Sequence, residues 1–330
     1  MTKKRHLALI LFLLVVILAI YNVRNGNSAT LKITLNMNKA IYNIGSKADF
    51  WGNVTLDGGT LSDALVAIEV DNQNGTAVIL RTKPTGTING TTTIQILSIT
   101  PCDATGTSKS NFSVNTMAFF KILLRNSENL SRQVEITLNL FDSKTVAFDA
   151  LTIFIGPLYS GDTELFVSEP IPADVSSGNS TVYCNVFTSL PKNGGYSLCP
   201  EASASFMIIN GRPPVVNIPE QNSQGMYNLT FRVDNYNQKT RPFRPGSYNA
   251  TVTCRYQSET TSLAKAFEVV LTADINRDGS VDIFDAILLS NGFNTTPANP
   301  KWNPNADINS DGIVDIYDAI ILSNNFGNTA

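Results

Sequence analysis

The C-terminal part of the chain carries a duplicated acidic loop, and each copy is followed by a short apolar segment. "ADINRDGSVDIFDAILLSNGF" runs from Ala273 to Phe293, and "ADINSDGIVDIYDAIILSNNF" repeats it from Ala306 to Phe326. Oxygen-bearing side chains recur at alternate positions of each loop, and a glycine stands at position 6, where a sharp turn needs a positive φ. The repeat therefore predicts two tight loops, each leading into a short apolar helix.

The oxygen donors of both loops are typical of a site for a hard divalent cation. Ca²⁺ takes roughly six to eight oxygen ligands, and alternate residues of a tight loop point inward to supply them. We expect two Ca²⁺ ions, with aspartate at position 12 as the closing ligand and a backbone carbonyl from position 7. Two Asx-rich turns before two amphipathic helices are the alternative, but turn chemistry does not require aspartate at position 12. The predicted ligands are Asp274, Asn276, Asp278, Ser280, Asp282 and Asp285 in the first loop, and Asp307, Asn309, Asp311, Ile313, Asp315 and Asp318 in the second.

The motif D-x-N-x-D-G-x-V-D-I-[FY]-D resembles that of dockerins, over the stretch from Asp274 to Ala330. The resemblance implies a pair of calcium-binding loop–helix units that dock into a cohesin-like domain of another protein. Dockerins of cellulosomes usually carry small hydroxyl residues at loop positions 10 and 11, which the cohesin contacts. Here these positions hold large apolar residues, which we expect to face a more apolar partner or to pack on this protein's own body. They are Ile283, Phe284, Ile316 and Tyr317.

The N-terminus predicts export from the cytoplasm. Three basic residues precede an apolar run from Leu7 to Tyr21. This run suits a signal peptide and is short for a membrane span, which needs about 20 residues. No clear cleavage site follows, so residues 1–29 are either a signal peptide or an uncleaved membrane anchor. We expect an extracellular or cell-surface protein that contacts the membrane at least during export. Glycosylation sequons fit this location, at Asn53, Asn74, Asn89, Asn111, Asn129, Asn179, Asn228, Asn249 and Asn294.

The four cysteines all lie in the exported part of the chain, and an even number in an oxidising compartment suggests two disulfides. "TVYCNVF" and "TVTCRYQ" both place cysteine on the same strand face as valine. This parity favours a Cys184–Cys254 bridge and leaves Cys102 to pair with Cys199. Four buried free thiols are the alternative, because free cysteine packs as a small hydrophobic residue.

Residues 30–270 alternate between short apolar-polar segments and Gly, Asn and Asp turns, which is the pattern of an all-β sandwich. We assign residues 30–105 to one Ig-like sandwich and 106–270 to a second one with a loop at 210–225. The strands after residue 225 could also form a small third unit. The prediction for the whole chain is a mainly β fold, with Ig-like sandwiches followed by a small all-α dockerin-like domain at 271–330.

Two further resemblances concern this body. The first unit is similar to the macroglobulin-like and bacterial Ig-like modules of exported proteins, through Tyr42, Gly45, Gly52 and the "ALVAI" segment. The stretch "PKNGGYSLCPE" resembles one found in archaeal surface proteins that bear dockerins. Both resemblances favour a cell-surface protein.

The residue inventory argues against an enzyme. The only histidine is His6, which excludes histidine triads and histidine-bound zinc from the exported part. A net charge of −3 makes nucleic acid an unsuitable partner. Paired carboxylates, as in glycosidases, remain, but no motif joins two of them, and Glu201 reads as a turn or capping residue. The candidates are Asp49, Asp63, Glu69, Asp71, Asp142, Glu164, Glu169, Asp174 and Glu201.

We therefore expect a non-catalytic surface protein that docks a cohesin-like partner through its calcium-binding tail. In one alternative, the tail packs on its own β-sandwich body and stabilises it. In another, the body binds polysaccharide through exposed aromatic residues, although aromatic residues in sandwiches usually belong to the core. The aromatic candidates are Trp51, Tyr159, Phe243 and Tyr248.

Overall fold

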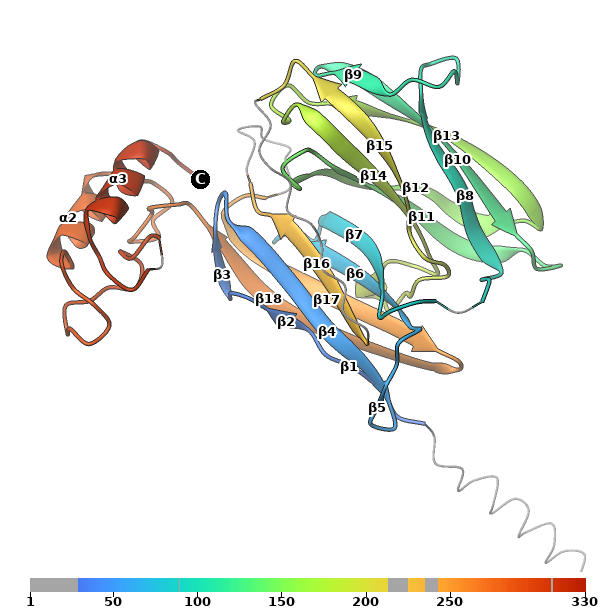
Figure 1. Ribbon diagram of the computed structural model, residues 1–330, viewed down its shortest axis with the longest axis horizontal. Coiled ribbons are helices and arrows are strands. Elements are labelled where there is room, and N and C mark those ends of the chain that lie inside the picture. Colours follow the sequence, from blue (N-terminus) through green and yellow to red (C-terminus); the bar gives the residue numbers. More distant parts are fainter. Residues whose placement is uncertain (1–28, 89, 213–224, 235–242, 310) are drawn as a thin grey trace, which may run out of the picture.

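The computed structural model describes residues 29–88, 90–212, 225–234, 243–309 and 311–330. Two β-sandwiches form the body, and a small helical domain lies to one side of it (Figure 1). The predicted signal peptide or anchor at residues 1–29 lies almost wholly outside the described residues. Across the described part of the chain, no helix has the length and apolar character needed to cross a membrane.

The first sandwich consists of two five-stranded sheets. One sheet is built around β4 (Lys47–Leu56), with β1 (Leu31–Ile33), β2 (Asn36–Met37), β5 (Gly59–Thr60) and β16 (Met226–Arg232) paired to it. The other sheet has the order β3 (Ile41–Asn43), β18 (Glu259–Val270), β17 (Gly246–Tyr256), β6 (Leu65–Asp71) and β7 (Ala77–Pro84).

The second sandwich combines a three-stranded and a five-stranded sheet. The smaller sheet has the order β13 (Gly161–Ile171), β10 (Thr116–Asn126) and β8 (Ile94–Cys102). The larger sheet has the order β12 (Ala147–Leu158), β11 (Arg132–Phe141), β14 (Gly178–Phe187), β15 (Ala202–Ile209) and β9 (Asn111–Ser113). A 3₁₀ turn, η1 (Pro191–Asn193), lies in the loop between β14 and β15.

The second sandwich is inserted into the first one, which corrects the predicted domain boundaries. β16 pairs with β4, β17 with β6, and β18 with β3, so these three strands complete the first sandwich and not the second. The inserted sandwich occupies residues 94–209, between β7 and β16. Alternation of apolar residues shows which face of a strand is buried but not which strand lies beside it, so sequence order suggested the wrong neighbours. Of the predicted loop at 210–225, residues 213–224 lie outside the described part.

Each sandwich has its own apolar core. Strand β4 alternates buried and half-buried residues, as a strand with one face toward a core should. Aromatic rings fill the first core, where Phe50 packs edge-on against Phe231 and Phe267. Phe243 and Tyr248 belong to this core, with 0% and 3% exposure, so they are not available for binding polysaccharide.

Strands β6 and β7 depart from the alternating pattern, because both of their faces are buried. Six consecutive residues of β7, from Val78 to Lys83, have almost no exposed surface. One face of the strand meets the first core. On the other face, Leu80 packs with Ala67 and with Phe187 of the second sandwich. The two sandwiches therefore share a buried interface along β7, which we call the joint.

The four cysteines are buried free thiols, which corrects both predicted bridges. Cys184 and Cys199 lie in the core of the second sandwich, whereas Cys254 lies in the core of the first one. Strand parity correctly placed Cys184 and Cys254 toward a core but could not show that the two cores are different. Burial raises the pKa of Cys199 and of Cys254 to about 12, so both thiols stay protonated at neutral pH.

The C-terminal domain contains two short helices, α2 (Ile283–Asn291) and α3 (Ile316–Asn325), as the repeat predicted. Its small apolar core includes Leu271, Val281, Leu289 and Val314. Because β18 ends at Val270, this domain begins directly where the body ends.

Candidate docking and calcium-binding site

The two acidic loops adopt the same conformation. Asp274 accepts hydrogen bonds from the backbone amides of Asp278 (3.1 Å) and Gly279 (3.0 Å). Asp307 accepts the equivalent bonds in the second loop, at 3.1 and 2.9 Å. The position-6 glycines both have a φ of 90°, a value that side chains with a Cβ rarely adopt. The duplicated sequence thus gives duplicated geometry.

The position-12 carboxylates are the most buried groups of the loops. Asp285 and Asp318 have no exposed surface. Asp285 Oδ1 accepts from the amides of Ile275 (2.7 Å) and Asn276 (3.1 Å), and Oδ2 accepts from the amide of Asp282 (2.8 Å). Asp282 in turn caps helix α2, which completes a capping box. Aspartate at position 12 therefore ties the start of each loop to the start of the helix that follows.

The loops offer oxygen donors only, which suits Ca²⁺. Burial raises the pKa of Asp274, the amide of Gly279 opposes that shift, and the negative charges of Asp285 and Asp278 add to it. These carboxylates therefore repel one another, and a cation between them would relieve the repulsion. Within the described ranges, however, no three Asp, Glu, His or Cys side chains converge closely enough to form a metal cluster. The individual ligands stay a prediction.

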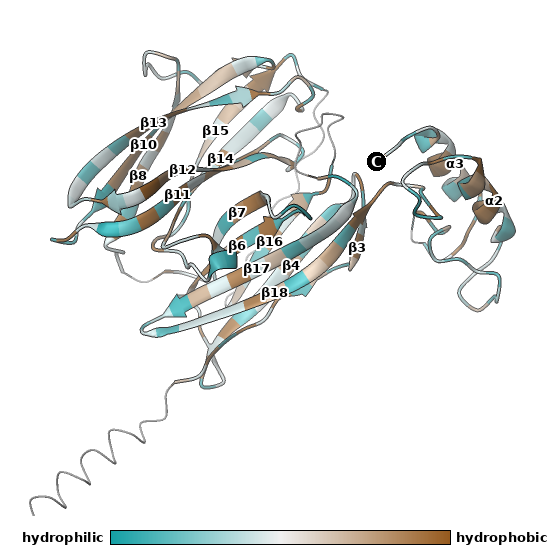
Figure 2. Ribbon diagram, turned by 180° about the vertical axis from the view of Figure 1, so that it is seen from behind, coloured by the Kyte–Doolittle hydropathy of each residue, from teal (hydrophilic) through white to brown (hydrophobic). Residues whose placement is uncertain are grey.

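Each helix presents several large apolar residues to solvent. Ile283 and Phe284 on α2 are 58% and 60% exposed, and Ile316 and Tyr317 on α3 are 57% and 63% exposed. Figure 2 shows apolar residues in brown along both helices. The alternative that these four side chains pack on the protein's own body is therefore wrong. Sequence reasoning missed Ile287 and Ile320, which extend the same surface and could have been found from their i, i+4 spacing.

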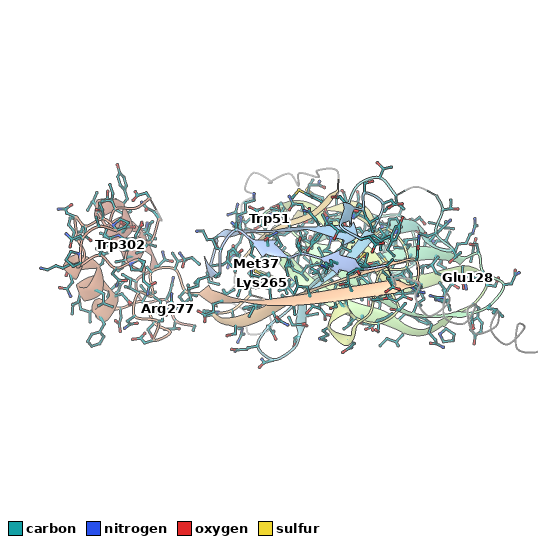
Figure 3. The ribbon with its side chains drawn as sticks, turned by 90° about the horizontal axis from the view of Figure 1, so that it is seen from below. Met37, Trp51, Glu128, Lys265, Arg277 and Trp302 are labelled. Atoms are coloured by element: carbon teal, nitrogen blue, oxygen red, sulfur yellow. The ribbon has the colours of Figure 1, made fainter. Side chains whose placement is uncertain are left out.

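Contact between the helical domain and the body is narrow. The hydroxyl of Thr272 donates to the carbonyl of Ile44 (2.7 Å), and Ile44 packs against the core of the helical domain. Arg277 lies on the side of the domain that faces the body (Figure 3) and contacts Glu268 at 3.7 Å. The exposed helix residues take no part in this contact, so they remain free for a partner.

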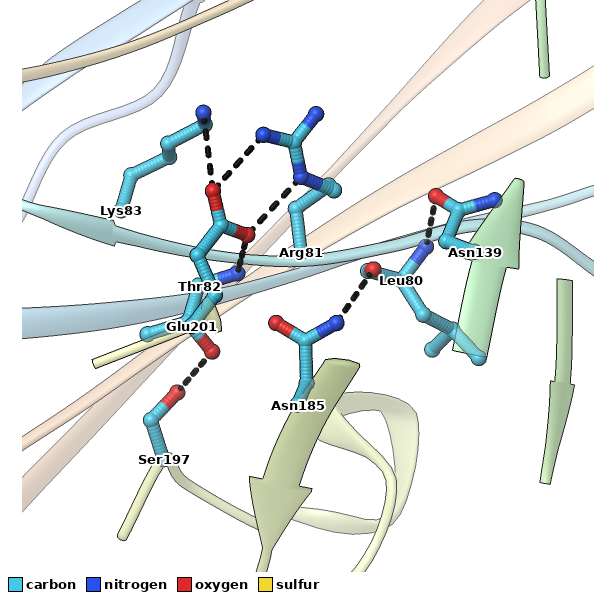
Figure 4. A network of polar contacts seen from close by, with 8 residues as sticks. All are labelled: Leu80, Arg81, Thr82, Lys83, Asn139, Asn185, Ser197 and Glu201. Carbon is cyan, nitrogen blue, oxygen red and sulfur yellow. Dashed lines mark hydrogen bonds and ion pairs between the residues drawn. The ribbon is translucent and has the colours of Figure 1, made fainter. Parts of the chain in front are cut away.

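Two polar clusters hold the joint between the sandwiches. Sequence reasoning named their carboxylates Glu69, Asp71 and Glu201 but not the cationic partners that bind them. In the first cluster (Figure 4), the Glu201 carboxylate accepts hydrogen bonds from Arg81 Nε at 2.8 Å, Arg81 Nη2 at 2.7 Å and Lys83 Nζ at 3.1 Å. Burial alone would raise the pKa of Glu201, but the two cations outweigh it and hold the pKa at about 2. Glu201 is thus the centre of an ion cluster and not a turn residue.

The second cluster joins η1 to β6. Lys192 Nζ lies 2.9 Å from Asp71 Oδ1 and 3.2 Å from Glu69 Oε1, and the Lys192 amide donates to Glu69 Oε2 at 2.8 Å. These residues are far apart in sequence and belong to different sandwiches. Only the insertion of one sandwich into the other brings them together.

The remaining aromatic candidates lie apart from both clusters. Trp51 is half-buried on β4, and Tyr159 is 69% exposed beyond the end of β12. They lie on different sandwiches and form no shared surface with the buried pair Phe243 and Tyr248.

Three solved structures are distant likenesses of this chain. The Pseudomonas fluorescens alkylpurine DNA glycosylase AlkC is 13% identical, with a TM-score of 0.28, over 36% of this chain and 30% of the glycosylase. The C-terminal domain of wzt is 12% identical, with a TM-score of 0.30, over 42% of this chain and 81% of that domain. A CARDB domain from Pyrococcus furiosus is 12% identical, with a TM-score of 0.24, over 35% and 87%. Such scores indicate nothing about function.

Comparison with protein families is informative for the C-terminal part. No curated protein matches this chain. Residues 272–327 match the sequence model of the dockerin type I domain, and this range contains both acidic loops and both helices. The C-terminal domain of this chain is therefore a dockerin type I domain, carried by a mainly β body.

Proposed function

We propose that this protein docks onto a cohesin-type domain of another cell-surface protein, and that its body is a non-catalytic spacer. Dockerin domains bind cohesin-type partners and typically occur in extracellular or cell-surface proteins. The observation that carries the proposal for this chain is the exposed apolar surface that α2 and α3 share. We call these six residues the docking face: Ile283, Phe284, Ile287, Ile316, Tyr317 and Ile320.

The docking face is costly to leave in water. Burying one large apolar side chain contributes about 1.5–3 kcal/mol, so a partner that covers several of them gains a large part of a specific binding energy. Neither helix has a basic residue in its last turn, and the only acidic residues in the first turns, Asp285 and Asp318, are buried. The partner surface is therefore expected to be apolar and to depend little on charge pairing.

We expect binding of the partner to require calcium. The residues that would hold it are the aspartate and asparagine side chains of the two loops, from Asp274 to Asp285 and from Asp307 to Asp318, with a backbone carbonyl at position 7. When bound, the ions supply positive charge that offsets the converging carboxylates. Asp282 and Asp315 cap the starts of the two helices, so the folded conformation of the loops determines where the docking face lies.

The body supports a spacer more than an enzyme. The carboxylates of Glu201 and Glu69 form ion pairs with cationic side chains of the facing sandwich, so they hold the two sandwiches together. The joint fixes the two sandwiches relative to each other, and the first sandwich, which contains both β1 and β18, separates the N-terminal end of the body from the dockerin.

Calorimetric titration of the full chain with a purified cohesin-type domain tests this function. We expect binding in calcium and none with a chelator. The fourfold change I283S/F284S/I316S/Y317S should weaken binding at least about 100-fold, because it removes apolar contacts on both helices. Ile155→Ser with Tyr159→Ser is the matched control, because both residues are exposed on the body. Undiminished binding by the fourfold variant would contradict the assigned docking face.

A further inference from the structure

The second cluster of the joint contains a lysine held against two carboxyl groups. Lys192 Nζ lies 2.9 Å from Asp71 Oδ1, 3.2 Å from Glu69 Oε1 and 2.8 Å from the carbonyl of Gly75. Glu69 and Asp71 are two residues apart on β6, so their side chains share one face of the sheet. A hydrogen bond to Oδ1 keeps the amine within van der Waals reach of Asp71 Cγ.

The loop that carries the lysine is fixed in place. Pro191 begins η1, and Gly194 ends it in the left-handed region with a φ of 79°. The Lys192 amide donates to Glu69 Oε2 at 2.8 Å, and the hydroxyl of Thr253 on β17 donates to the carbonyl of Gly195. The lysine backbone is thus bonded to the same glutamate that its side chain approaches. Such preorganisation holds reacting groups together at high effective concentration.

Glu69 is fully buried, with Lys192 and Asp71 beside it and an apolar cluster next to it on the sheet. It has no exposed surface, and its register partner on β7 is Leu80, which packs with Ala67 and Phe187. Burial is the main cause that raises the pKa of Glu69 to about 7, the Lys192 amide opposes the shift, and the charge of Asp71 adds to it. A carboxyl group with such a pKa exchanges protons readily at neutral pH.

We propose that Lys192 and Asp71 condense to an intramolecular isopeptide bond that joins the two sandwiches covalently, with Glu69 transferring the protons. Asp71 is 8% exposed and Lys192 31% exposed at the side chain, so the lysine reaches the site from the surface and the released water has a way out.

The condensation balances without any co-reactant. Burial by itself would lower the pKa of Lys192, but contact with Asp71 and Glu69 together outweighs it and raises the pKa, so the lysine enters as an ammonium ion. The ammonium ion gives one proton to Glu69, and the amine then attacks Asp71 Cγ. A C–N bond forms and one C–O bond breaks. Glu69 returns its proton to the departing oxygen, which takes a second proton from the attacking nitrogen. An ammonium and a carboxylate thus become an amide and one water, with no change of oxidation state.

The joint contains a second lysine–carboxylate contact, Lys83 with Glu201, that can be compared with Lys192 and Asp71. Lys83 Nζ lies 3.1 Å from Glu201 Oε1, but Arg81 also binds this carboxylate through two hydrogen bonds. The cations hold the pKa of Glu201 at about 2, so Glu201 exchanges no proton with Lys83 at neutral pH, whereas Lys192 contacts Glu69, whose pKa of about 7 suits it to take and return a proton. The chemistry therefore selects Lys192 and not Lys83.

Mass spectrometry of the full chain, made in a host without N-glycosylation, tests the bond. A tryptic digest should contain a branched peptide that joins Lys192 to Asp71 and weighs one water less than the sum of its two parts. Trypsin should not cleave after Lys192. Separate, unmodified peptides with cleavage after Lys192, or a bond at Lys83, would overturn the proposal.

Three variants separate chemistry from folding. Glu69→Gln keeps the size and shape of the side chain but removes its proton exchange, so we expect the two unlinked peptides with a folded chain. Lys192→Arg keeps the positive charge and should also leave the peptides unlinked. Lys83→Arg is the matched control and should retain the branched peptide. A branched peptide in the Glu69→Gln chain at wild-type yield would exclude the assigned role of Glu69.

Discussion

Glu201 of the second sandwich receives two hydrogen bonds from the guanidinium of Arg81 in the first, at 2.7 and 2.8 Å. Arg81 is 1% exposed at its side chain, and its guanidinium carbon lies 3.4 Å from the ring centroid of Tyr183. A buried cation of this kind is tolerated only with a partner, because desolvation of an unpaired charge is costly. The pair therefore ties the position of one sandwich to that of the other.

Replacing Glu201 by Gln should destabilise the body strongly. The change leaves Arg81 and Lys83 buried against a neutral amide, and breaking a buried pair costs about 3–5 kcal/mol. Chemical denaturation monitored by fluorescence measures the loss. Glu164→Gln, at an exposed position of β13, is the control and should change stability by less than about 0.5 kcal/mol. A similar small effect for both variants would show that the ion cluster does not hold the joint.

The Glu201 cluster should also give the body an acid-sensitive component of stability. The folded-state pKa of Glu201 is about 2, below the ordinary value of 4.5. Its contribution is therefore fully present above pH 4.5 and is lost as the pH falls through about 2. The difference in unfolding free energy between the wild type and Glu201→Gln should shrink over this window. A difference that stays constant with pH would contradict the assignment.

Asn185 should stabilise the body by satisfying a backbone carbonyl at the outer edge of β7. Its side-chain amide donates to the carbonyl of Leu80 at 2.9 Å, and the Leu80 amide donates to Asn139 Oδ1 at 3.1 Å. Two asparagines of the second sandwich thus replace a neighbouring strand at this residue. Asn185→Leu leaves a buried carbonyl without a donor and should cost about 1–3 kcal/mol. Asn179→Leu, at an exposed position of the same strand, is the control, and equal losses would argue against edge closure.

Glu169 should make the second sandwich less stable in alkaline solution. Burial first, and then the charge and hydrogen bond of Asp149, raise its pKa from 4.5 to about 7. Its stabilising contribution is therefore present below pH 4.5 and is lost as the pH rises through about 7. Glu169→Gln should raise the melting temperature at about pH 8 and leave it nearly unchanged at about pH 5. Equal shifts at both pH values would exclude this titration as the cause.

The paired change Asp274→Ala and Asp307→Ala should abolish calcium-induced ordering of the dockerin. Each residue accepts two backbone hydrogen bonds within its loop and is a predicted ligand at position 1. Circular dichroism during calcium titration should show a gain of helix in the wild type only. Asp57→Ala, on a turn of the body, is the control. Normal calcium-dependent folding of the paired variant would disprove the ligand assignment.

Sequence alone identified the features that depend on neighbouring residues. The loops, the helices and the dockerin family follow from a local motif. The spacing of its oxygen-bearing side chains, the positive φ of its glycine and the cap of its helix all depend on residues within a dozen positions of one another. The period-two pattern gave the all-β class, and parity showed that the cysteines face inward. These are short-range properties of the backbone, so they can be read along the chain.

Only the tertiary structure decided how the strands are combined. Met226–Arg232 pairs with β4 across an inserted sandwich, and the same insertion brings Arg81 to Glu201 and Lys192 to Asp71. It also separates Cys184 from Cys254. Strand pairing over such separations is determined by the packing of whole sheet faces and by long-range polar contacts. Neither can be predicted from the periodicity of a single strand.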